Sequence, residues 1–402
     1  MKTFQVSFQR VAGTALAIGY FLFGAPLLSL FKTMSQKTGV VTFNSLFAIL
    51  ALCGCGAFHS HTGISVPTPM AQYRAYGASI TYGMGVRDPS TQSFPALVAG
   101  FEHVSFANNA ISGDQACDVM PRQVLPNQDR PDLTSHPTYS LLIGTNDADM
   151  RGFGAYEAVY RLCHQGIASW LAIPFEHKVL ANGIGVTTTG PGELETSSPW
   201  AAWTTQGQGS SISFEITVNR ESVIYAWPMI DDASPATYSY SLDGVTLGSA
   251  AARPTPSMST AHGTTRLVAF QRLPPVRAGK HVVTFTQTNS GESGLSVIGV
   301  GVPRGPVEVR LPFVLVGTIT YQYHGSSGDP CTSANETPCL EYNNDIQEEV
   351  SMFSADGLNV RVFDTRKYMF ATAAEMSDSI HPNALGQLEL SHSVEAVWPK
   401  SD

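Results

Sequence analysis

The chain has 402 residues, of which 43% are hydrophobic and 14% are charged. This balance supplies enough apolar side chains for a large buried core and excludes a disordered protein. The formal net charge is -9, and the absence of a basic stripe to neutralise phosphates argues against a nucleic-acid partner. With 36 Gly and 25 Pro, the composition favours strands and loops over helical bundles.

The N-terminus contains two apolar segments that indicate export or membrane attachment. The first, Val11–Phe31, carries no charged residue and is long enough to cross the hydrocarbon core of a bilayer, about 30 Å thick. The second ends in Leu52–Cys55, which resembles a bacterial lipobox, where the cysteine after a small residue is lipidated. Residues 1–55 are therefore predicted to be a hydrophobic leader, with Cys55 the lipidation site of an exported, membrane-anchored cell-envelope protein.

Two interpretations of this leader stay open. A chain that starts at Met34 has a short basic region, an apolar stretch over Val40–Leu52 and a cleavage point before Cys55, which is the shape of an export signal. A chain that starts at Met1 keeps the first apolar segment as a transmembrane anchor. Both interpretations place the remaining residues outside the cytoplasm. Residues 56–71, rich in Pro, Ser, Thr and His, are expected to form a flexible linker.

Residues 72–181 alternate between strand and helix patterns. In chain order the predicted elements are a strand at Tyr73–Tyr76, a helix around Phe94–Val98, strands at Val104–Ala107 and Tyr139–Ile143, and a long helix over Tyr156–Pro174. Alternation of this kind indicates a parallel sheet flanked by helices.

Residues 182–304 lose the helical periodicity and contain short alternating segments separated by Gly and Pro. The predicted strands are Ser211–Val218, Ser222–Pro228, Thr237–Leu242, Thr265–Gln271, His281–Gln287 and Leu295–Val302. Such a series indicates an antiparallel β-sandwich of jelly-roll type. Asp243-Gly244 is a hairpin signal.

Residues 305–402 return to the first pattern. The predicted elements are strands at Val307–Val316 and Leu358–Asp364 and helices at Tyr342–Ser354 and Ala384–Val397. The fold class is therefore α/β: a domain with a parallel sheet, formed by residues 72–181 and 305–402, is interrupted by the inserted sandwich of residues 182–304.

The cysteines support export. Cys331 and Cys339 lie in a loop rich in Ser, Thr, Pro and Asn and are close enough to form a small disulfide ring in an oxidising compartment. Cys117 and Cys163 either pair or remain buried thiols. No cysteine spacing indicates zinc, and no histidines stand at ligand spacing on one element, so neither a metal nor a cofactor is predicted. His164 and His177 are expected on helix surfaces.

Four stretches at predicted strand ends carry the candidate functional residues. They are Ser79 in GASITYG, Gly113 in NNAISGD, Asn146 in GTND and His381 in DSIHP. Because the carboxyl ends of parallel strands line one crevice, these stretches are expected to converge. Each also has a structural alternative: Ser79 as a helix N-cap, Gly113 as a turn residue, Asn146-Asp147 as a cap, and Asp378 as the N-cap of the last helix with His381 on the surface.

In this order, the four stretches resemble the sequence blocks of the SGNH hydrolases, also called the GDSL esterase and lipase family. The resemblance covers the α/β portion and leaves out the leader and the sandwich. It implies a flavodoxin-like three-layer fold with Ser79 as nucleophile, His381 as general base and Asp378 as the carboxylate that orients the imidazole. It also implies an oxyanion hole formed by the backbone N–H groups of Ser79 and Gly113 and the side-chain amide of Asn146.

The chemistry of these residue types agrees with those roles. A serine hydroxyl is a poor nucleophile until an adjacent imidazole removes its proton, and the imidazole needs an acceptor that fixes its tautomer. Asp378 and His381 are three residues apart, so one turn of backbone can place both on one face. One departure is that the family's Gly-Asp-Ser is here Gly77-Ala78-Ser79. It puts the local hydrogen bonding of the turn in doubt rather than the mechanism.

The sequence predicts a serine esterase that hydrolyses carboxylic esters through an acyl-enzyme. Acyl or acetyl esters of carbohydrates, as small molecules or polysaccharides, are the expected substrates by analogy with modular SGNH esterases that carry β-sandwich modules. The alternatives are a carbohydrate-binding surface lipoprotein whose catalytic site has decayed, and an acyltransferase on the same scaffold. Aromatic residues of the sandwich, such as Trp203 and Trp227, offer sugar-stacking surfaces, although alternating aromatics in strands more often form core.

Overall fold

The computed structural model describes residues 72–127, 137–196, 201–231, 236–251, 266–290, 294–323, 331–332 and 336–400. The predicted leader with Cys55 and the predicted linker lie outside these described residues. Within the described ranges, no helix has the length and hydropathy that a membrane span requires.

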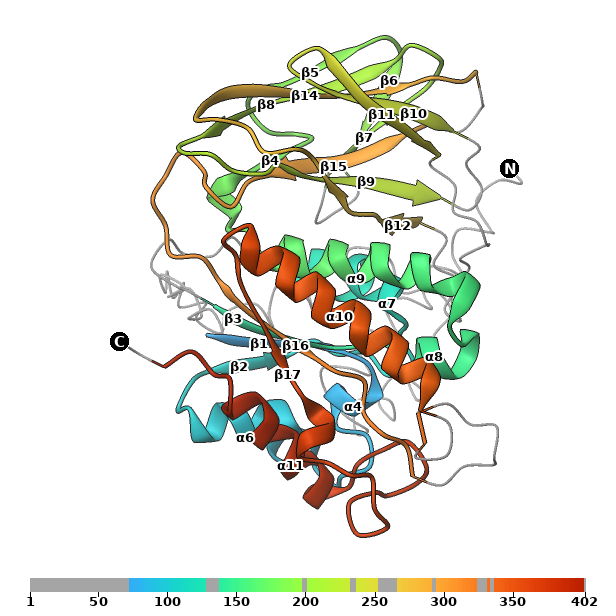
Figure 1. Cartoon of the computed structure of the whole chain (residues 1–402), viewed down its shortest axis with the longest axis vertical. Coiled ribbons are helices and arrows are strands. Elements are labelled where there is room, and N and C mark those ends of the chain that lie inside the picture. Colours follow the sequence, from blue (N-terminus) through green and yellow to red (C-terminus); the bar gives the residue numbers. More distant parts are fainter. Residues whose placement is uncertain are drawn as a thin grey trace, which may run out of the picture. The chain divides into compact units, whose positions relative to one another are not determined.

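A five-stranded parallel sheet forms the centre of the α/β portion (Figure 1). Its strand order is β17-β16-β3-β1-β2, and every neighbouring pair is parallel. The register pairs Gly77 with Leu142, so β1 and β3 end at the same level. The residues that follow these two strands therefore emerge at one edge of the sheet. The strands are β1 (Tyr73–Gly77), β2 (Phe106–Asn108), β3 (Thr138–Leu142), β16 (Phe313–Gly317) and β17 (Asn359–Phe363).

Helices cover both faces of this sheet, which gives three layers (Figure 1). On one face lie α6 (Phe94–Phe101) and α11 (Ala384–Glu395), and on the other lie α9 (Glu157–Ala172) and α10 (Thr337–Ala355). The shorter helices are α4 (Ser79–Tyr82), α5 (Pro89–Gln92), α7 (Ala116–Val119) and α8 (Thr145–Arg151), with η1 (Met120–Val124), η2 (Leu125–Asn127), η3 (Gly154–Tyr156), η4 (Phe175–His177) and η5 (Thr365–Lys367).

Two antiparallel sheets form the sandwich (Figure 1). One has the order β11-β10-β14-β8-β5, and the other has β12-β9-β15-β7-β6 with β13 beside β9 and β4 beside β15. Because β4 pairs with β15, the sandwich begins at Lys178, ahead of its expected start at residue 182. The strands are β4 (Lys178–Leu180), β5 (Val186–Thr189), β6 (Gly192–Glu195), β7 (Ala202–Thr205), β8 (Ser211–Val218), β9 (Tyr225–Asp231), β10 (Thr237–Leu242), β11 (Val245–Ala251), β12 (Arg266–Val268), β13 (Gln271–Arg272), β14 (Gly279–Gln287) and β15 (Ser296–Gly301).

Two local patterns in the sequence had different outcomes. The hairpin signal Asp243-Gly244 is confirmed, because it joins β10 to β11 with φ values of 51° and 80°, as a two-residue hairpin turn of type I′ requires. The strand predicted from Val307 is wrong at its start, since β16 begins only at Phe313. Pro306 and Pro312 flank the segment before β16, and proline cannot donate to a sheet ladder.

Helix α9 lies between the parallel sheet and the second sandwich sheet (Figure 1). A Cβ on Gly166 would lie 2.8 Å from the backbone oxygen of Val268, so the helix approaches β12 closely. The indole N–H of Trp227 donates to the Ser169 hydroxyl (3.0 Å), and its ring meets that of Trp170 edge-on at 4.7 Å. One hydrophobic cluster therefore runs from the parallel sheet through α9 into the sandwich.

The two histidines expected on helix surfaces are buried, so that expectation is wrong. His164 on α9 places Nδ1 2.8 Å from Oε2 of Glu349 on α10, and His177 donates from Nε2 to the Val307 carbonyl at 2.7 Å. From Gly166 to Ala172 every residue of α9 is buried, because a second layer covers the outer side of the helix, which a pattern within the helix does not reveal.

Two disulfides are present in the described residues. Cys117 of α7 is joined to Cys163 of α9, and Cys331 is joined to Cys339. Cys117 and Cys163 therefore form a disulfide and are not buried thiols.

Candidate active site

Ser79 stands where β1 ends and α4 begins. A Cβ on Gly77 would lie 2.3 Å from the Leu142 carbonyl oxygen, so only glycine allows this turn to pass so close to β3. The N-cap of α4 is Ala78 and not Ser79. As the first residue of the helix, Ser79 has a backbone N–H with no acceptor inside the helix.

The side chains of Ser79, His381 and Asp378 form a hydrogen-bonded chain. Nε2 of His381 is 3.0 Å from Oγ of Ser79, and Nδ1 of His381 is 2.8 Å from Oδ2 of Asp378. An ionised carboxylate only accepts hydrogen bonds, so the imidazole proton belongs on Nδ1. Nε2 then has a lone pair for the hydroxyl proton of Ser79.

Asp378 is held by the backbone of its own loop. Its Oδ1 accepts hydrogen bonds from the N–H groups of Ile380 (2.8 Å) and His381 (2.7 Å). Burial by itself would raise the pKa of Asp378, but the hydrogen bonds from the His381 ring and from these N–H groups outweigh it and lower the pKa. Asp378 is thus ionised at neutral pH. The N-cap of α11 is Asn383, which rules out the capping alternative for Asp378.

The loop that carries His381 is closed on itself. The backbone N–H and the hydroxyl of Ser377 both donate to the His381 carbonyl, each at 2.9 Å. A Cβ on Gly85 would lie 2.5 Å from the Pro382 carbonyl oxygen. Gly85 follows α4, the helix that begins with Ser79. The segment after Ser79 therefore packs directly against the loop that carries His381.

Gln387 is a positioning residue that the sequence did not point to. It is fully buried on α11, donates to the Ile80 carbonyl at 3.0 Å and accepts from the Phe94 N–H at 2.8 Å. This side chain links the helix that follows His381 to the helix that begins with Ser79. A glutamine within a helix normally suggests an exposed position, so no signal in the sequence marks it.

The predicted oxyanion residues belong to one hydrogen-bonded unit. Gly113 has φ of 86°, and the turn it belongs to is fixed to β1 by the Ile111 N–H, which donates to the Gly77 carbonyl at 3.2 Å. The amide of Asn146 on α8 donates to the Asp114 carbonyl at 2.8 Å. Nδ2 carries two hydrogens, and this bond uses one of them.

Gln123 braces the turn in which alanine replaces the family's aspartate. It accepts from the Gly77 N–H at 3.0 Å and donates to the Gly77 carbonyl at 2.7 Å. Nε2 also contacts the fully buried Asp114 carboxylate at 2.8 Å, which forms an ion pair with Arg122. The backbone groups of Gly77 are therefore satisfied without an acidic side chain at Ala78. No helix was predicted from the sequence at Met120–Val124, so the role of Gln123 was not expected.

Asp147, next to Asn146, is a buried carboxyl that the sequence suggested only as part of a cap. It accepts a hydrogen bond from the Ala116 N–H at 3.0 Å and joins the start of α8 to α7. Burial, together with the nearby Asp118, raises its pKa to about 7. The described residues contain no group of three or more His, Cys, Asp or Glu side chains placed to hold a metal ion.

This arrangement can perform acyl transfer. A hydroxyl meets a proton acceptor, and a carboxylate orients that acceptor. Ser79 is 6% exposed, whereas the side chains of His381 and Asp378 are 17% and 54% exposed. The hydroxyl is thus shielded, while the acid side of the site faces solvent.

The chain matches no protein-family model and no curated protein. Among solved structures, it is similar to a two-domain esterase (CEX) active on acetylated mannans, with 12% identity, 59% of this chain and 91% of that chain covered, and a TM-score of 0.34. A family 35 carbohydrate binding module from an environmental isolate shows 11% identity over 33% of this chain and 96% of that chain, with a TM-score of 0.27. CBM35 from Cellvibrio japonicus Abf62 shows 14% identity over 34% and 98%, with a TM-score of 0.26.

Proposed function

We propose that this chain is a serine hydrolase of the SGNH type that cleaves carboxylic esters through an acyl-enzyme. The proposal depends above all on one observation. Ser79 and His381, 302 residues apart in the sequence, lie 3.0 Å apart through Oγ and Nε2, and the other nitrogen of the imidazole meets a carboxylate. This is the order of contacts that activates a serine.

Each residue has a defined role in the proposed reaction. Ser79 Oγ attacks the ester carbonyl while His381 Nε2 takes the hydroxyl proton and then gives it to the departing alcohol. Water repeats the attack on the acyl-enzyme with His381 as base. Asp378 holds the imidazole and stabilises its protonated form. The N–H groups of Ser79 and Gly113 and the amide of Asn146 bind the oxyanion.

The proposed substrates are acyl or acetyl esters of carbohydrates. The half-exposed carboxylate of Asp378 supports a bulky substrate, because the acid side of the proposed triad faces solvent. The sandwich is the part of the fold that we assign to the carbohydrate portion, by analogy with modular SGNH esterases. Transfer of the acyl group to a sugar hydroxyl uses the same acyl-enzyme and is separated from hydrolysis by product analysis with an acceptor present.

We further propose that the protein is exported and anchored by its leader. The two disulfides suit an oxidising compartment. The mass of the mature N-terminus tests this proposal. A diacylglyceryl group on Cys55 supports the lipoprotein form, retention of Val11–Phe31 supports a transmembrane anchor, and an unmodified N-terminus without either contradicts both.

The decisive experiment compares Ser79→Ala with Ser112→Ala. Ser112 is exposed, and its hydroxyl donates a hydrogen bond to Sδ of Met84 at 3.9 Å. Its replacement is the control because it removes a serine hydroxyl that has no proposed catalytic role. We expect Ser79→Ala to lower kcat for p-nitrophenyl acetate by about 10⁶-fold and to abolish fluorophosphonate labelling, with an unchanged melting temperature. Wild-type protein that is folded but neither labels nor hydrolyses esters would indicate the non-catalytic lipoprotein instead.

A further inference from the structure

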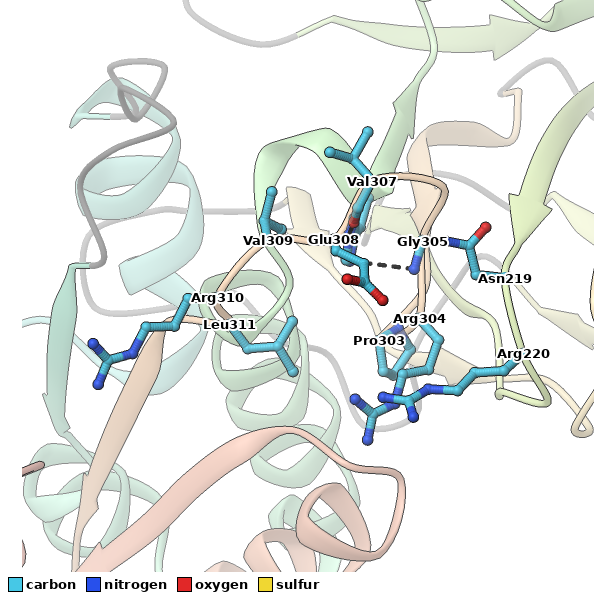
Figure 2. Close-up of a pocket in the computed structure, with 11 residues that line it drawn as sticks. Asn219, Arg220, Pro303, Arg304, Gly305, Val307, Glu308, Val309, Arg310 and Leu311 are labelled. Carbon is cyan, nitrogen blue, oxygen red and sulfur yellow. Dashed lines mark hydrogen bonds between the residues drawn. The ribbon is translucent and has the colours of Figure 1, made fainter. Parts of the chain in front are cut away.

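A cavity lies where the chain leaves the sandwich and continues toward β16 (Figure 2), and Ser79 is not among its lining residues. Its volume is about 500 Å³, and residues 303–311 form most of its wall. His177 of η4 and Asn219 and Arg220, which follow the last residue of β8, complete the lining. None of the candidate active-site residues contributes to it. The volume is that of a typical small-molecule site.

The charge of this cavity is positive, although the whole chain is acidic. Three arginines line it, Arg220, Arg304 and Arg310, against one acid, Glu308. Arg310 is directed to the other side of the segment (Figure 2) and lies 5.7 Å from the ring centre of Phe313. The guanidinium groups of Arg220 and Arg304 are therefore the charges that face a ligand.

These two guanidinium groups repel each other and lack a carboxylate partner within the described residues. Burial, and then the positive charge of Arg220, lower the pKa of Arg304. The backbone carbonyl of Arg304 accepts a hydrogen bond from the Asn219 N–H at 3.1 Å, and this bond does not involve the guanidinium group. Two like charges held together, with no ion pair to Glu308 or to another described carboxylate, form a site that an anion would stabilise.

His177 fixes the backbone of the segment that lines the cavity. His177 donates from Nε2 to the Val307 carbonyl at 2.7 Å and accepts at Nδ1 from the Gly305 N–H at 3.4 Å. Burial lowers the pKa of His177, so the ring is neutral at neutral pH and the positive charge comes from the arginines. A Cβ on Gly305 would lie 2.3 Å from the His177 ring, which makes glycine necessary here.

The guanidinium group of Arg304 also packs against the C-terminal end of α10. A Cβ on Gly357, just beyond the C-terminus of α10, would lie 2.5 Å from Nη2 of Arg304, so the guanidinium sits at the helix end, where backbone carbonyls favour a cation. The helix end therefore accounts for the position of Arg304. It does not account for the exposed Arg220 placed beside it.

We propose that this cavity binds an organic molecule that carries an oxyanion, a carboxylate or a phosphate, with the anion on Arg220 and Arg304. The guanidinium group presents paired N–H donors that match two oxygens of either anion, and the Asn219 side chain adds a donor at the rim. A bare ion would leave most of the cavity unfilled, since a water molecule takes up only about 30 Å³. The remaining volume holds the body of the ligand.

Calorimetric titration of the full chain tests this proposal with four probes. Glucuronate and glucose 6-phosphate place the two anions on the same ring, glucose lacks the anion, and inorganic phosphate lacks the ring. We expect at least one of the acidic sugars to bind more tightly than glucose and inorganic phosphate, and to bind more weakly as salt is raised. The tighter of the two acids identifies the anion.

Variants locate the binding. Arg220→Gln and Arg304→Gln should each weaken binding of the acidic sugar at least tenfold, whereas Arg277→Gln, an exposed arginine of the sandwich outside the cavity, should leave it unchanged. Arg220 is exposed, so its variant is expected to fold even if Arg304→Gln does not. Ser79→Ala should bind as the wild type does, which separates this site from the proposed catalysis. Acidic sugars that bind no better than glucose, unaltered binding by Arg220→Gln, or equal affinity for inorganic phosphate would overturn the proposal.

Discussion

Two histidine–carboxylate pairs of the α/β portion share the same short contact distance and differ in their exposure to solvent. In the pair His381–Asp378 and in the pair His164–Glu349, Nδ1 lies 2.8 Å from a carboxylate oxygen. The first pair is partly exposed, with His381 at 17% and Asp378 at 54%, whereas the second is buried at 0% and 3%. Nε2 of His381 faces the Ser79 hydroxyl, but Nε2 of His164 has no hydrogen-bond partner in the part of the chain that the structure describes.

The comparison shows that a paired imidazole does not make a site by itself. His381 has a hydroxyl on one side and solvent on the other, so it can receive a proton and release it. His164 is enclosed between α9 and α10 and has neither, and its pair with Glu349 instead links the two helices. Near the candidate site, hydrogen bonds lower the pKa of the accessible Asp378, while burial raises the pKa of Asp147, which belongs to neither pair.

The largest difference between the two pairs should appear in activity. We expect Asp378→Asn to reduce kcat by about 10⁴-fold, because an amide no longer fixes the tautomer that accepts the Ser79 proton. Its melting temperature should change little, since the side chain is half exposed. Glu349→Gln is the matched control and should keep kcat per folded molecule. Comparable kcat losses in both variants would remove the distinction.

The buried pair should instead matter for stability. Glu349→Ala leaves His164 without its partner in the core, and we expect the free energy of unfolding to fall by about 3 kcal/mol, as when one partner of a buried pair is removed. Denaturant unfolding measures this change. Replacing both residues, with His164→Phe and Glu349→Leu, should recover part of the loss. A single variant as stable as the wild type would contradict a linking role for the pair.

A smaller effect is expected from the oxyanion side of the site. Asn146→Ala removes the predicted third donor and should lower kcat by about 100-fold, equivalent to roughly 3 kcal/mol, with KM changed less than kcat. Single-turnover kinetics with p-nitrophenyl acetate measure the acylation step. An effect on KM alone would assign Asn146 to ground-state binding and not to the oxyanion.

The smallest effect concerns the pH dependence of stability through Asp147. Its pKa in the folded chain is raised to about 7, above that of the unfolded chain, so the stability it contributes is full below about pH 4 and is lost as the pH rises toward 7. Relative to Asp147→Asn, the wild type should lose about 2 kcal/mol between about pH 5 and 7. Parallel stability curves for the two proteins would show that Asp147 titrates normally.

Local patterns in the sequence predicted the alternation of strands and helices and the antiparallel character of the insertion, because periodicity reports which face of an element is buried. The stretches around Ser79 and His381 were found because strand ends of a parallel sheet share one edge. Contacts between segments distant in the sequence produce no local pattern, so they could not be predicted. Gln387 and Gln123 look like surface amides, and His164 looks like a polar position on an amphipathic helix. Each is buried by a partner that only the tertiary fold supplies.

The hydrophobic cluster around α9 has a consequence for how the molecule comes apart. Trp170 and Trp227 meet across the junction, so excising residues 178–302 would expose the outer side of α9 to water. The insertion is thus packed into the rest of the protein and is not an independent module. Heating should melt the sandwich and the parallel sheet together in a single calorimetric peak. A shortened variant without the sandwich would need a new polar surface on α9 before it could remain in solution.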